Sequence, residues 1–249
     1  MGKRIRAQRR GRGGSVWIAS THKRVAPATY PRTSSTNMVA RSGIIEDLVH
    51  DPGRGTPLAA IRLEDGQLFY NIAAEGIYVG QRIQMGPNAP LDVGNVLQLR
   101  DVPEGTLIYN VERHVNDGGK FARASGAYAT LIAHAGEDAL IKLTSDKTLY
   151  VEGNARATVG VVAAGGRTDK PLMKAGERFH LMRAKGHKYP KVKGVAMIAA
   201  VHPHGGGRHK HPGKPKTVAR GTPPGRKIGL IAARQTGRSK KRRIPGVSA

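Results

Sequence analysis

Acidic residues occupy only the middle of this 249-residue chain. The first acid is Glu46 and the last is Glu177, so the 45 residues at one end and the 72 at the other contain no Asp or Glu. The two acid-free ends carry 10 and 19 Lys and Arg, whereas the middle carries 13 against its 17 acids. A segment with charges of one sign repels itself and does not collapse alone. The pattern therefore predicts a folded, slightly acidic centre with two basic extensions.

The formal net charge of +25 makes a polyanion the simplest partner. Phosphates neutralise basic segments, and the counterions that this releases drive the binding of nucleic acid. The absence of Cys excludes disulfides, thiolate zinc sites and cysteine nucleophiles. No apolar run approaches the roughly 20 residues of a membrane span, and the basic segment 1–14 lacks the apolar stretch of a signal peptide. We therefore expect no membrane partner.

Short strands separated by turn residues dominate the middle of the chain and predict an all-β fold. The clearest signal is Asp65-Gly66, a two-residue hairpin turn between two apolar runs. About five short strands with such spacing are typical of a small closed barrel of the OB type, which we assign to residues 38–115. The expected strands are Leu58–Glu64, Gln67–Ile72, Ile77–Met85, Val93–Arg100 and Thr106–Val115.

A second small all-β unit is expected at residues 116–190, after the break at Asn116–Gly119. Apolar residues at spacings of 3, 4 and 3 then predict one short helix, packed on this second barrel; they are Leu172, Ala175, Phe179 and Met182. The expected strands of this unit are Tyr128–His134, Ala139–Thr144, Lys147–Val151 and Ala157–Ala164, with a turn at Ser145-Asp146.

The two ends are predicted to be RNA-binding extensions, an arm of residues 1–37 and a tail of residues 191–249. Six Gly and five Pro within residues 202–225 disfavour a packed core. At ~3.3–3.6 Å per residue the extended tail would span roughly 200 Å, enough to thread into a large partner. Trp17, the only Trp, suits either stacking on a base or packing into a protein surface.

The residues predicted to contact RNA lie in the arm, around the end of the predicted helix, and in the tail. They are Arg4, Arg6, Arg9, Arg10, Arg12, Lys23, Arg24, Lys185, Lys188, Lys191, Lys193, His202, His204, Gly205, Gly206, Gly207, Arg208, His209, Lys210, His211, Lys214, Lys216, Arg220, Arg226, Lys227, Arg234, Arg238, Lys240, Lys241, Arg242 and Arg243.

Four His at close spacing, His202, His204, His209 and His211, raise the possibility of a metal site. Their setting is a Gly/Pro loop full of Lys and Arg, and these cations disfavour a divalent ion. Hydrogen bonding to phosphate, 2′-OH or bases fits better, with Gly205–Gly207 offering exposed backbone donors. No acid follows Glu177 to orient a catalytic His, and no nucleophile elbow or complete P-loop occurs. We therefore predict no catalytic residues, no metal and no cofactor.

Several motifs together resemble the large-subunit ribosomal protein L2 family, in its archaeal and eukaryotic branch. The strongest is Gly194-Val195-Ala196-Met197 followed after four residues by His202-Pro203-His204-Gly205-Gly206-Gly207. The resemblance covers nearly the whole chain. It includes Asp51-Pro52-Gly53-Arg54, the run from Gly105 to Glu112, the run from Ala155 to Gly160, and Pro224-Gly225-Arg226-Lys227.

The resemblance implies an OB-like barrel, then an SH3-like barrel, then a tail buried in large-subunit rRNA. It implies a cytoplasmic structural protein of the ribosome that binds rRNA and supports assembly, tRNA binding and the peptidyl-transferase centre. The implied partners are large-subunit rRNA, neighbouring large-subunit proteins and, through an intersubunit bridge, small-subunit rRNA. The family's best-known His corresponds to His202, which we interpret as structural.

The chain departs from the family pattern at Ile198, where Asn is usual, and at Val201, where an acid is usual. Loss of an acid beside His202 removes an orienting partner and further disfavours catalysis. Two alternatives from other functional classes remain open. One is a metal-dependent nuclease built on the His cluster, which would bind metal or cleave RNA alone. The other is a DNA-compacting protein, which would prefer duplex DNA.

Overall fold

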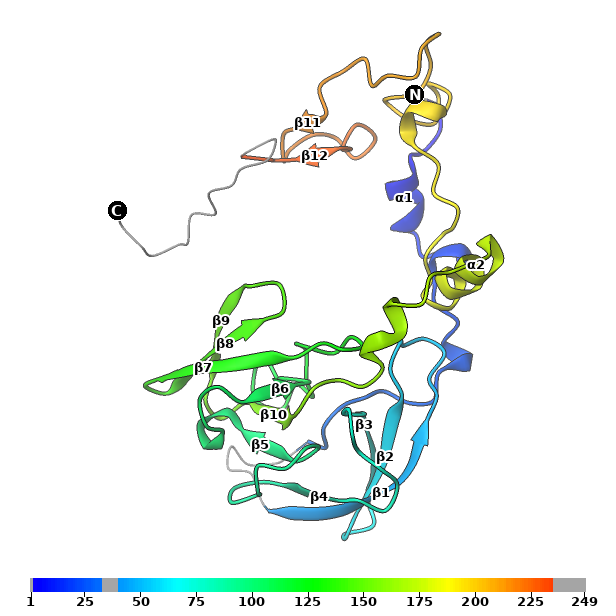
Figure 1. The fold of residues 1–249 in the computed structure, drawn as a ribbon. Helices are drawn as coiled ribbons and strands as arrows, with labels where there is room; N and C mark the ends of the chain where they lie inside the picture. Colours follow the sequence, from blue (N-terminus) through cyan, green and yellow to red (C-terminus); the bar gives the residue numbers. More distant parts are fainter. Residues whose placement is uncertain (1, 33–39, 235–249) are drawn as a thin grey trace. The chain divides into compact units, whose positions relative to one another are not determined.

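The computed structural model describes residues 2–32 and 40–234, and within these ranges the chain is mostly strands with two α-helices (Figure 1). The chain divides into two compact units. We call Ser20–Glu177 the barrel unit, and Met1–Ala19 together with Arg178–Ala249 the terminal unit. The predicted all-β class is confirmed.

The barrel unit is one continuous sheet of ten strands in the order β3-β2-β1-β4-β5-β10-β6-β7-β8-β9. The only parallel contact among them is between β4 and β5, and the rest are antiparallel. The strands are β1 Arg41–Val49, β2 Leu58–Leu63, β3 Leu68–Ile72, β4 Arg82–Met85, β5 Val96–Gln98, β6 Leu107–Tyr109, β7 Ala129–Ala135, β8 Asp138–Leu143, β9 Thr148–Glu152 and β10 Arg156–Val159.

The first core lies under β1 to β4. The predicted hairpin forms as expected, with Gly66 in the left-handed region (φ +82°) and β2 paired antiparallel with β3. Strand β1 is not among the expected strands, because Glu46 and Asp47 interrupt its apolar pattern. A bulge between Ile45 and Asp47 lets the strand keep Ile45 in the core while both acids stay exposed.

The second core unites β5 to β10. Leu97, Ile108, Leu131, Ile141 and Val151 belong to one buried cluster of this core. The predicted division at 115/116 places β5 and β6 with the first barrel. In the structure both strands pair with β10 and pack in the second core. The four-part division of the chain itself stays a prediction.

Buried polar contacts tie the segment before β1 to the barrel unit. Tyr30 Oη donates to the carbonyl oxygen of Asn110 at 3.0 Å and lies 2.6 Å from Thr158 Oγ1. Arg156 and Glu112 form a buried two-pronged ion pair, with N···O distances of 2.6 and 3.0 Å, and Arg156 also donates to the carbonyl of Pro31. Residues 28–31 are therefore part of this folded unit rather than of a free arm.

Both chain ends together build the terminal unit. Its elements are α1 Arg6–Arg10, the final part of α2 Ala175–Ala184, and the short parallel pair β11 Thr217–Val218 and β12 Leu230–Ile231. Ile5 is buried in this unit, which contradicts the expectation that neither basic end is packed without RNA. The backbone N–H of Lys3 donates to the carbonyl of Ala200 at 3.1 Å, and Arg6 donates to that of Val192.

The predicted helix exists, although it begins at Ala175 and leaves Leu172 outside it. None of its residues is buried, so the expected packing of an apolar face on the second barrel is not observed. Gly186 (φ +68°) closes the end of α2, where its N–H donates to the carbonyl of Arg183. No helix in the described part of the chain has both the length and the apolar character to cross a bilayer.

Candidate nucleic-acid interface

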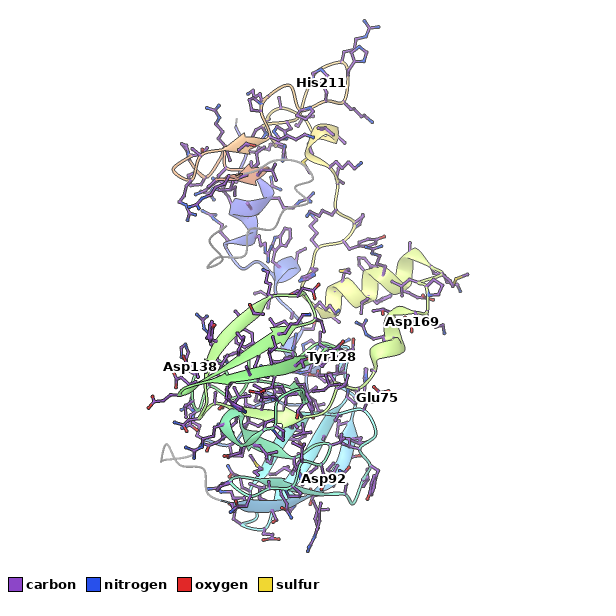
Figure 2. All side chains as sticks on the ribbon, turned by 60° about the vertical axis from the view of Figure 1, so that its left-hand side comes forward. Glu75, Asp92, Tyr128, Asp138, Asp169 and His211 are labelled. Atoms are coloured by element: carbon purple, nitrogen blue, oxygen red, sulfur yellow. The ribbon has the colours of Figure 1, made fainter. Side chains whose placement is uncertain are left out.

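The two units differ completely in charge. Residues 1–19 and 178–249 hold 25 of the 42 Lys and Arg and none of the 17 acids. Residues 20–177 hold 17 of each, so the barrel unit is formally neutral. Figure 2 labels four of the acids, Glu75, Asp92, Asp138 and Asp169, on the barrel unit and His211 on the tail. The whole net charge of the chain therefore belongs to the terminal unit.

The predicted RNA-contact residues fall mainly in this basic unit. Lys23 and Arg24 are the exceptions, because they lie at the start of the barrel unit. None of the predicted Lys, Arg and His that the structure describes is buried, so their charged or polar ends reach solvent. Five of the predicted residues lie outside the described residues; they are Arg238, Lys240, Lys241, Arg242 and Arg243.

His202 is held as a neutral ring inside its loop. Its Nδ1 accepts a hydrogen bond from the backbone N–H of His204 at 3.0 Å, which requires that nitrogen to be unprotonated. The ring also lies so close to the Cα of Gly194 that any side chain there would collide with it. Burial, with the nearby His204 and Arg6, lowers the pKa of His202 below its usual value.

The glycines after His204 mainly allow close packing. The Gly205 N–H donates to the carbonyl of His202, and the Gly206 N–H to that of Met197, both at 2.9 Å. The expectation that these donors are exposed is therefore wrong for Gly205 and Gly206. A Cβ at residue 205 would lie 2.5 Å from the carbonyl oxygen of Ile198. The motif thus forms a tight turn that leaves no room for a side chain at residue 205.

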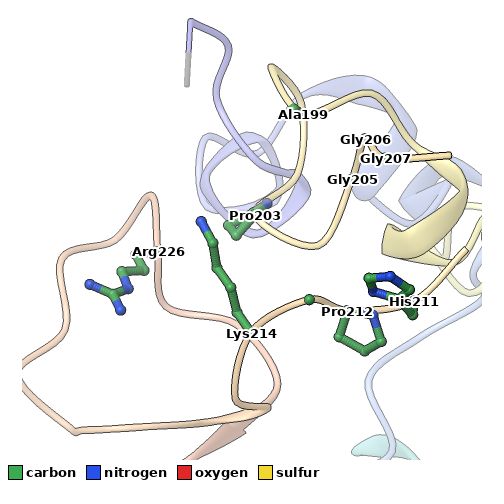
Figure 3. Close-up of a pocket in the computed structure, with 10 residues that line it drawn as sticks. Ala199, Pro203, Gly205, Gly206, Gly207, His211, Pro212, Lys214 and Arg226 are labelled. Carbon is green, nitrogen blue, oxygen red and sulfur yellow. The ribbon is translucent and has the colours of Figure 1, made fainter. Parts of the chain in front are cut away.

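This turn borders a pocket of about 550 Å³ (Figure 3). Lys214, Arg226 and His211 line it together with the glycines of the turn. No carboxylate lines the pocket, and none occurs anywhere in the terminal unit. A concave surface lined by Gly and Pro, with two cationic side chains and no acid, fits a phosphate or a polar base edge. In residues 2–32 and 40–234 no group of three or more His, Asp or Glu is placed to hold a metal ion.

A second cationic surface lies on the barrel unit around the loop Asp51–Gly55, and Arg24 is its only arginine among the predicted RNA contacts. Arg54 pairs with the buried Asp51 at 2.8 Å. The guanidinium groups of Arg24 and Arg167 lie against Gly53 and Gly55, where a Cβ would approach them to 2.5 and 2.6 Å. With Arg123, these side chains form what we call the arginine cluster: Arg24, Arg54, Arg123 and Arg167.

Arg123 anchors this cluster. It donates to the carbonyl of Gly119 at 2.7 Å and to that of Ala28 at 2.6 Å. Partial burial and then the nearby charge of Arg54 lower the pKa of Arg123. Like charges held this close favour a bound anion. The sequence pointed to parts of the site through the predicted RNA contact Arg24 and the motif Asp51-Pro52-Gly53-Arg54, but it did not bring them together, because the four arginines come from four separate segments of the chain.

Comparison with known proteins matches two consecutive family models to almost the whole chain. Residues 3–85 match "Ribosomal Proteins L2, RNA binding N-terminal domain", and residues 92–225 match "Ribosomal Proteins L2, C-terminal domain". The boundary between the two matches falls before β5, in agreement with the strand pairing described above.

Curated relatives extend the match to both ends. Proteins named large ribosomal subunit protein uL2 share 50% identity in Korarchaeum cryptofilum, over 97% of this chain and 98% of the relative. The relative from Desulfurococcus amylolyticus is 51% identical over 96% of this chain and 100% of its own length. The relative from Ignicoccus hospitalis is 51% identical over 97% of this chain and 96% of its own length. With both domain models matched in order and half of the residues identical over nearly full length, this chain belongs to the ribosomal protein L2 (uL2) family.

Proposed function

We propose that this chain is a structural, rRNA-binding protein of the large ribosomal subunit. The observation that carries the proposal is the concentration of the whole +25 charge in an acid-free unit built from both chain ends. The relatives that share about half of its residues are named as proteins of that subunit. A surface of this charge density binds polyanions by releasing their counterions, and RNA is the polyanion that the description of the matched N-terminal domain names.

Two surfaces divide the work of binding. The terminal unit supplies the bulk of the charge and the His202–Gly207 turn with its cationic pocket. The arginine cluster on the neutral barrel unit supplies a local anion site whose guanidinium groups are already fixed by protein contacts. Fixed guanidinium groups lose little entropy on binding phosphate, so the cluster sets the position of the barrel unit on the RNA.

The finer roles belong to the same proposal. They are support of subunit assembly, contact with small-subunit rRNA as an intersubunit bridge, tRNA binding, organisation of the peptidyl-transferase centre, and residence in cytoplasmic ribosomes. A structural rather than catalytic role for His202 is supported by its engaged Nδ1 and by the lack of any acid in its unit. A general base would need a free nitrogen and, usually, an orienting partner.

Sedimentation of ribosomes in sucrose gradients at increasing salt tests the proposal. The tagged chain should sediment with the large subunit and with joined ribosomes, and should stay bound at salt that strips loosely associated proteins. Its presence only in free protein fractions, or on the small subunit alone, would contradict the proposal. Preference of the purified chain for duplex DNA over large-subunit rRNA would favour a DNA-compacting role instead.

The arginine cluster is tested by removing equal charge at two places. The double variant Arg24→Gln/Arg167→Gln should reduce the salt slope of log K for rRNA by about 2, since each phosphate contact contributes ~0.9. The matched control Arg82→Gln/Arg113→Gln removes the same charge from exposed positions outside the cluster and should change the slope little. Equal salt slopes for the two double variants would show that the arginine cluster is not part of the RNA interface.

A further inference from the structure

Trp17 lines a pocket in the terminal unit together with several of the predicted RNA contacts. The pocket has a volume of about 520 Å³, and Lys3, Arg4, Arg9 and Arg12 line it together with Trp17. This volume is in the range of sites that bind small molecules. Its lining contains no carboxylate, because the first acid of the chain is Glu46. The pocket therefore combines one large aromatic surface with four cationic side chains.

Local contacts fix the Trp17 side chain at this position. Residues Ser15–Trp17 form a short 3-10 turn, in which the N–H of Trp17 donates to the carbonyl of Gly14 at 2.8 Å. The ammonium nitrogen of Lys188 lies 5.9 Å from the centroid of the indole ring, a cation–π distance. The turn that carries Lys188 is held by Gly186, where a Cβ would press into the backbone of Ile18 and Ala19.

The surroundings of Trp17 are unlike those of a core residue. The large hydrophobic side chains beside it in the sequence, Val16 and Ile18, are 57% and 54% exposed, and Trp17 itself is only partly covered. A packed plug would be surrounded by apolar groups, whereas this indole opens toward guanidinium and ammonium groups. An aromatic face beside several cations is the arrangement with which proteins hold an unstacked nucleobase and its flanking phosphates.

We propose that Trp17 is the stacking platform for one unpaired nucleobase of rRNA, with Arg4, Arg9 and Arg12 binding the adjacent phosphates. This inference rests on the proposed function, because it deepens rRNA binding to a specific single-stranded nucleotide site. It differs from general charge attraction in one respect. Charge attraction accepts any polyanion, whereas stacking requires an exposed base, so single-stranded RNA is distinguished from duplex RNA and from polyanions without bases.

Fluorescence of the full-length chain tests the proposal directly, because Trp17 is the only Trp. Three probes are titrated at low salt. They are oligouridylate, an RNA hairpin with a fully paired stem and a loop closed so that none of its bases is exposed, and a heparin fragment of similar charge. Stacked oligouridylate should quench the indole strongly at saturation, while the hairpin and heparin should bind with much smaller changes. Equal quenching by all three probes would overturn the proposal.

Substitution supplies the second measurement. Trp17→Leu should weaken oligouridylate binding by roughly 5- to 150-fold, the loss of one base–aromatic stack. Trp17→Phe should recover a large part of this loss, and the control Tyr150→Leu, which removes an exposed aromatic of the barrel unit, should change nothing. Wild-type affinity in Trp17→Leu would overturn the site. Binding of large-subunit rRNA by the wild-type chain, measured in parallel, separates the outcomes: tight rRNA binding without Trp quenching rejects this site but leaves the proposed function intact.

Discussion

The backbone N–H of Lys3 donates to the carbonyl of Ala200 at 3.1 Å, joining two residues between which the whole barrel unit lies in the sequence. Ile5, two residues further along, is 1% exposed, and Arg6 donates to the carbonyl of Val192. Parts of the two acid-free ends therefore share one small structure. Their charges act on RNA together rather than as two independent extensions.

The first prediction concerns the origin of RNA affinity. A fragment of residues 20–177 retains the buried Ala28 and Tyr30 and should unfold cooperatively, whereas a fragment starting at residue 38 should be clearly less stable. Because the barrel unit is neutral overall, fragment 20–177 should bind rRNA far more weakly than the full chain. If the full chain contacts ~6–10 phosphates, its affinity should fall ~10³–10⁵-fold between about 50 and 200 mM salt. Filter binding measures the affinity of the fragment and the salt dependence of the full chain. Equal affinity of the fragment and the full chain for rRNA would refute the prediction.

The second prediction concerns the buried pair Glu112–Arg156, whose side chains are 0% and 4% exposed. Glu112→Gln leaves a buried guanidinium without its carboxylate and should lower the free energy of unfolding by ~3–5 kcal/mol. Arg62→Met breaks the exposed pair with Glu46 and should cost only ~0–1 kcal/mol. Chemical denaturation of the full chain measures both. Similar losses in the two variants would show that burial does not strengthen the first pair.

The third prediction concerns acid sensitivity of the turn at His202. Its folded pKa lies below the unfolded value of about 6.5, so the open loop binds more protons than the closed loop. The closed turn is therefore fully stable above pH ~6.5 and weakens as the pH falls toward the folded pKa. Protonation of Nδ1 also removes the acceptor used by the His204 N–H. Protection of the His204 and Gly206 amides, corrected for intrinsic exchange rates, should decrease at acid pH. A titration midpoint of His202 at or above 6.5 would contradict this.

The fourth prediction concerns steric fit at Gly205. The Cβ of Gly205→Ala would lie 2.5 Å from the carbonyl oxygen of Ile198 and closer still to that of Met197. The turn must shift, at a cost of roughly 1–3 kcal/mol, and rRNA affinity should fall with it. Gly221→Ala is the control, because nothing lies within 4 Å of its Cβ. Amide exchange of Gly206 and filter binding report the two effects, and equal behaviour of the variants would reject the steric argument.

Local and compositional signals in the sequence were reliable. The all-β class, the hairpin at Asp65-Gly66 and the helix near residue 175 follow from short-range preferences, which act within a few residues. The family motifs around His202 are contiguous as well, and the comparisons confirm the resemblance. The RNA-contact residues of the tail stay predictions. The structure leaves the described Lys, Arg and His side chains accessible, whereas the N–H groups of Gly205 and Gly206 are engaged within the turn.

The position of the charge along the chain and the resemblance to the family are both properties of residue order, so they can be read without a structure. Which charges meet depends on the tertiary structure. The arginine cluster gathers Arg24, Arg54, Arg123 and Arg167 from four separate segments, and the terminal unit joins residue 3 to residue 200. The amides of Gly205 and Gly206 prove to be engaged within the turn. Contacts between distant segments depend on packing and hydrogen bonding across the whole fold, which local periodicity and composition do not encode.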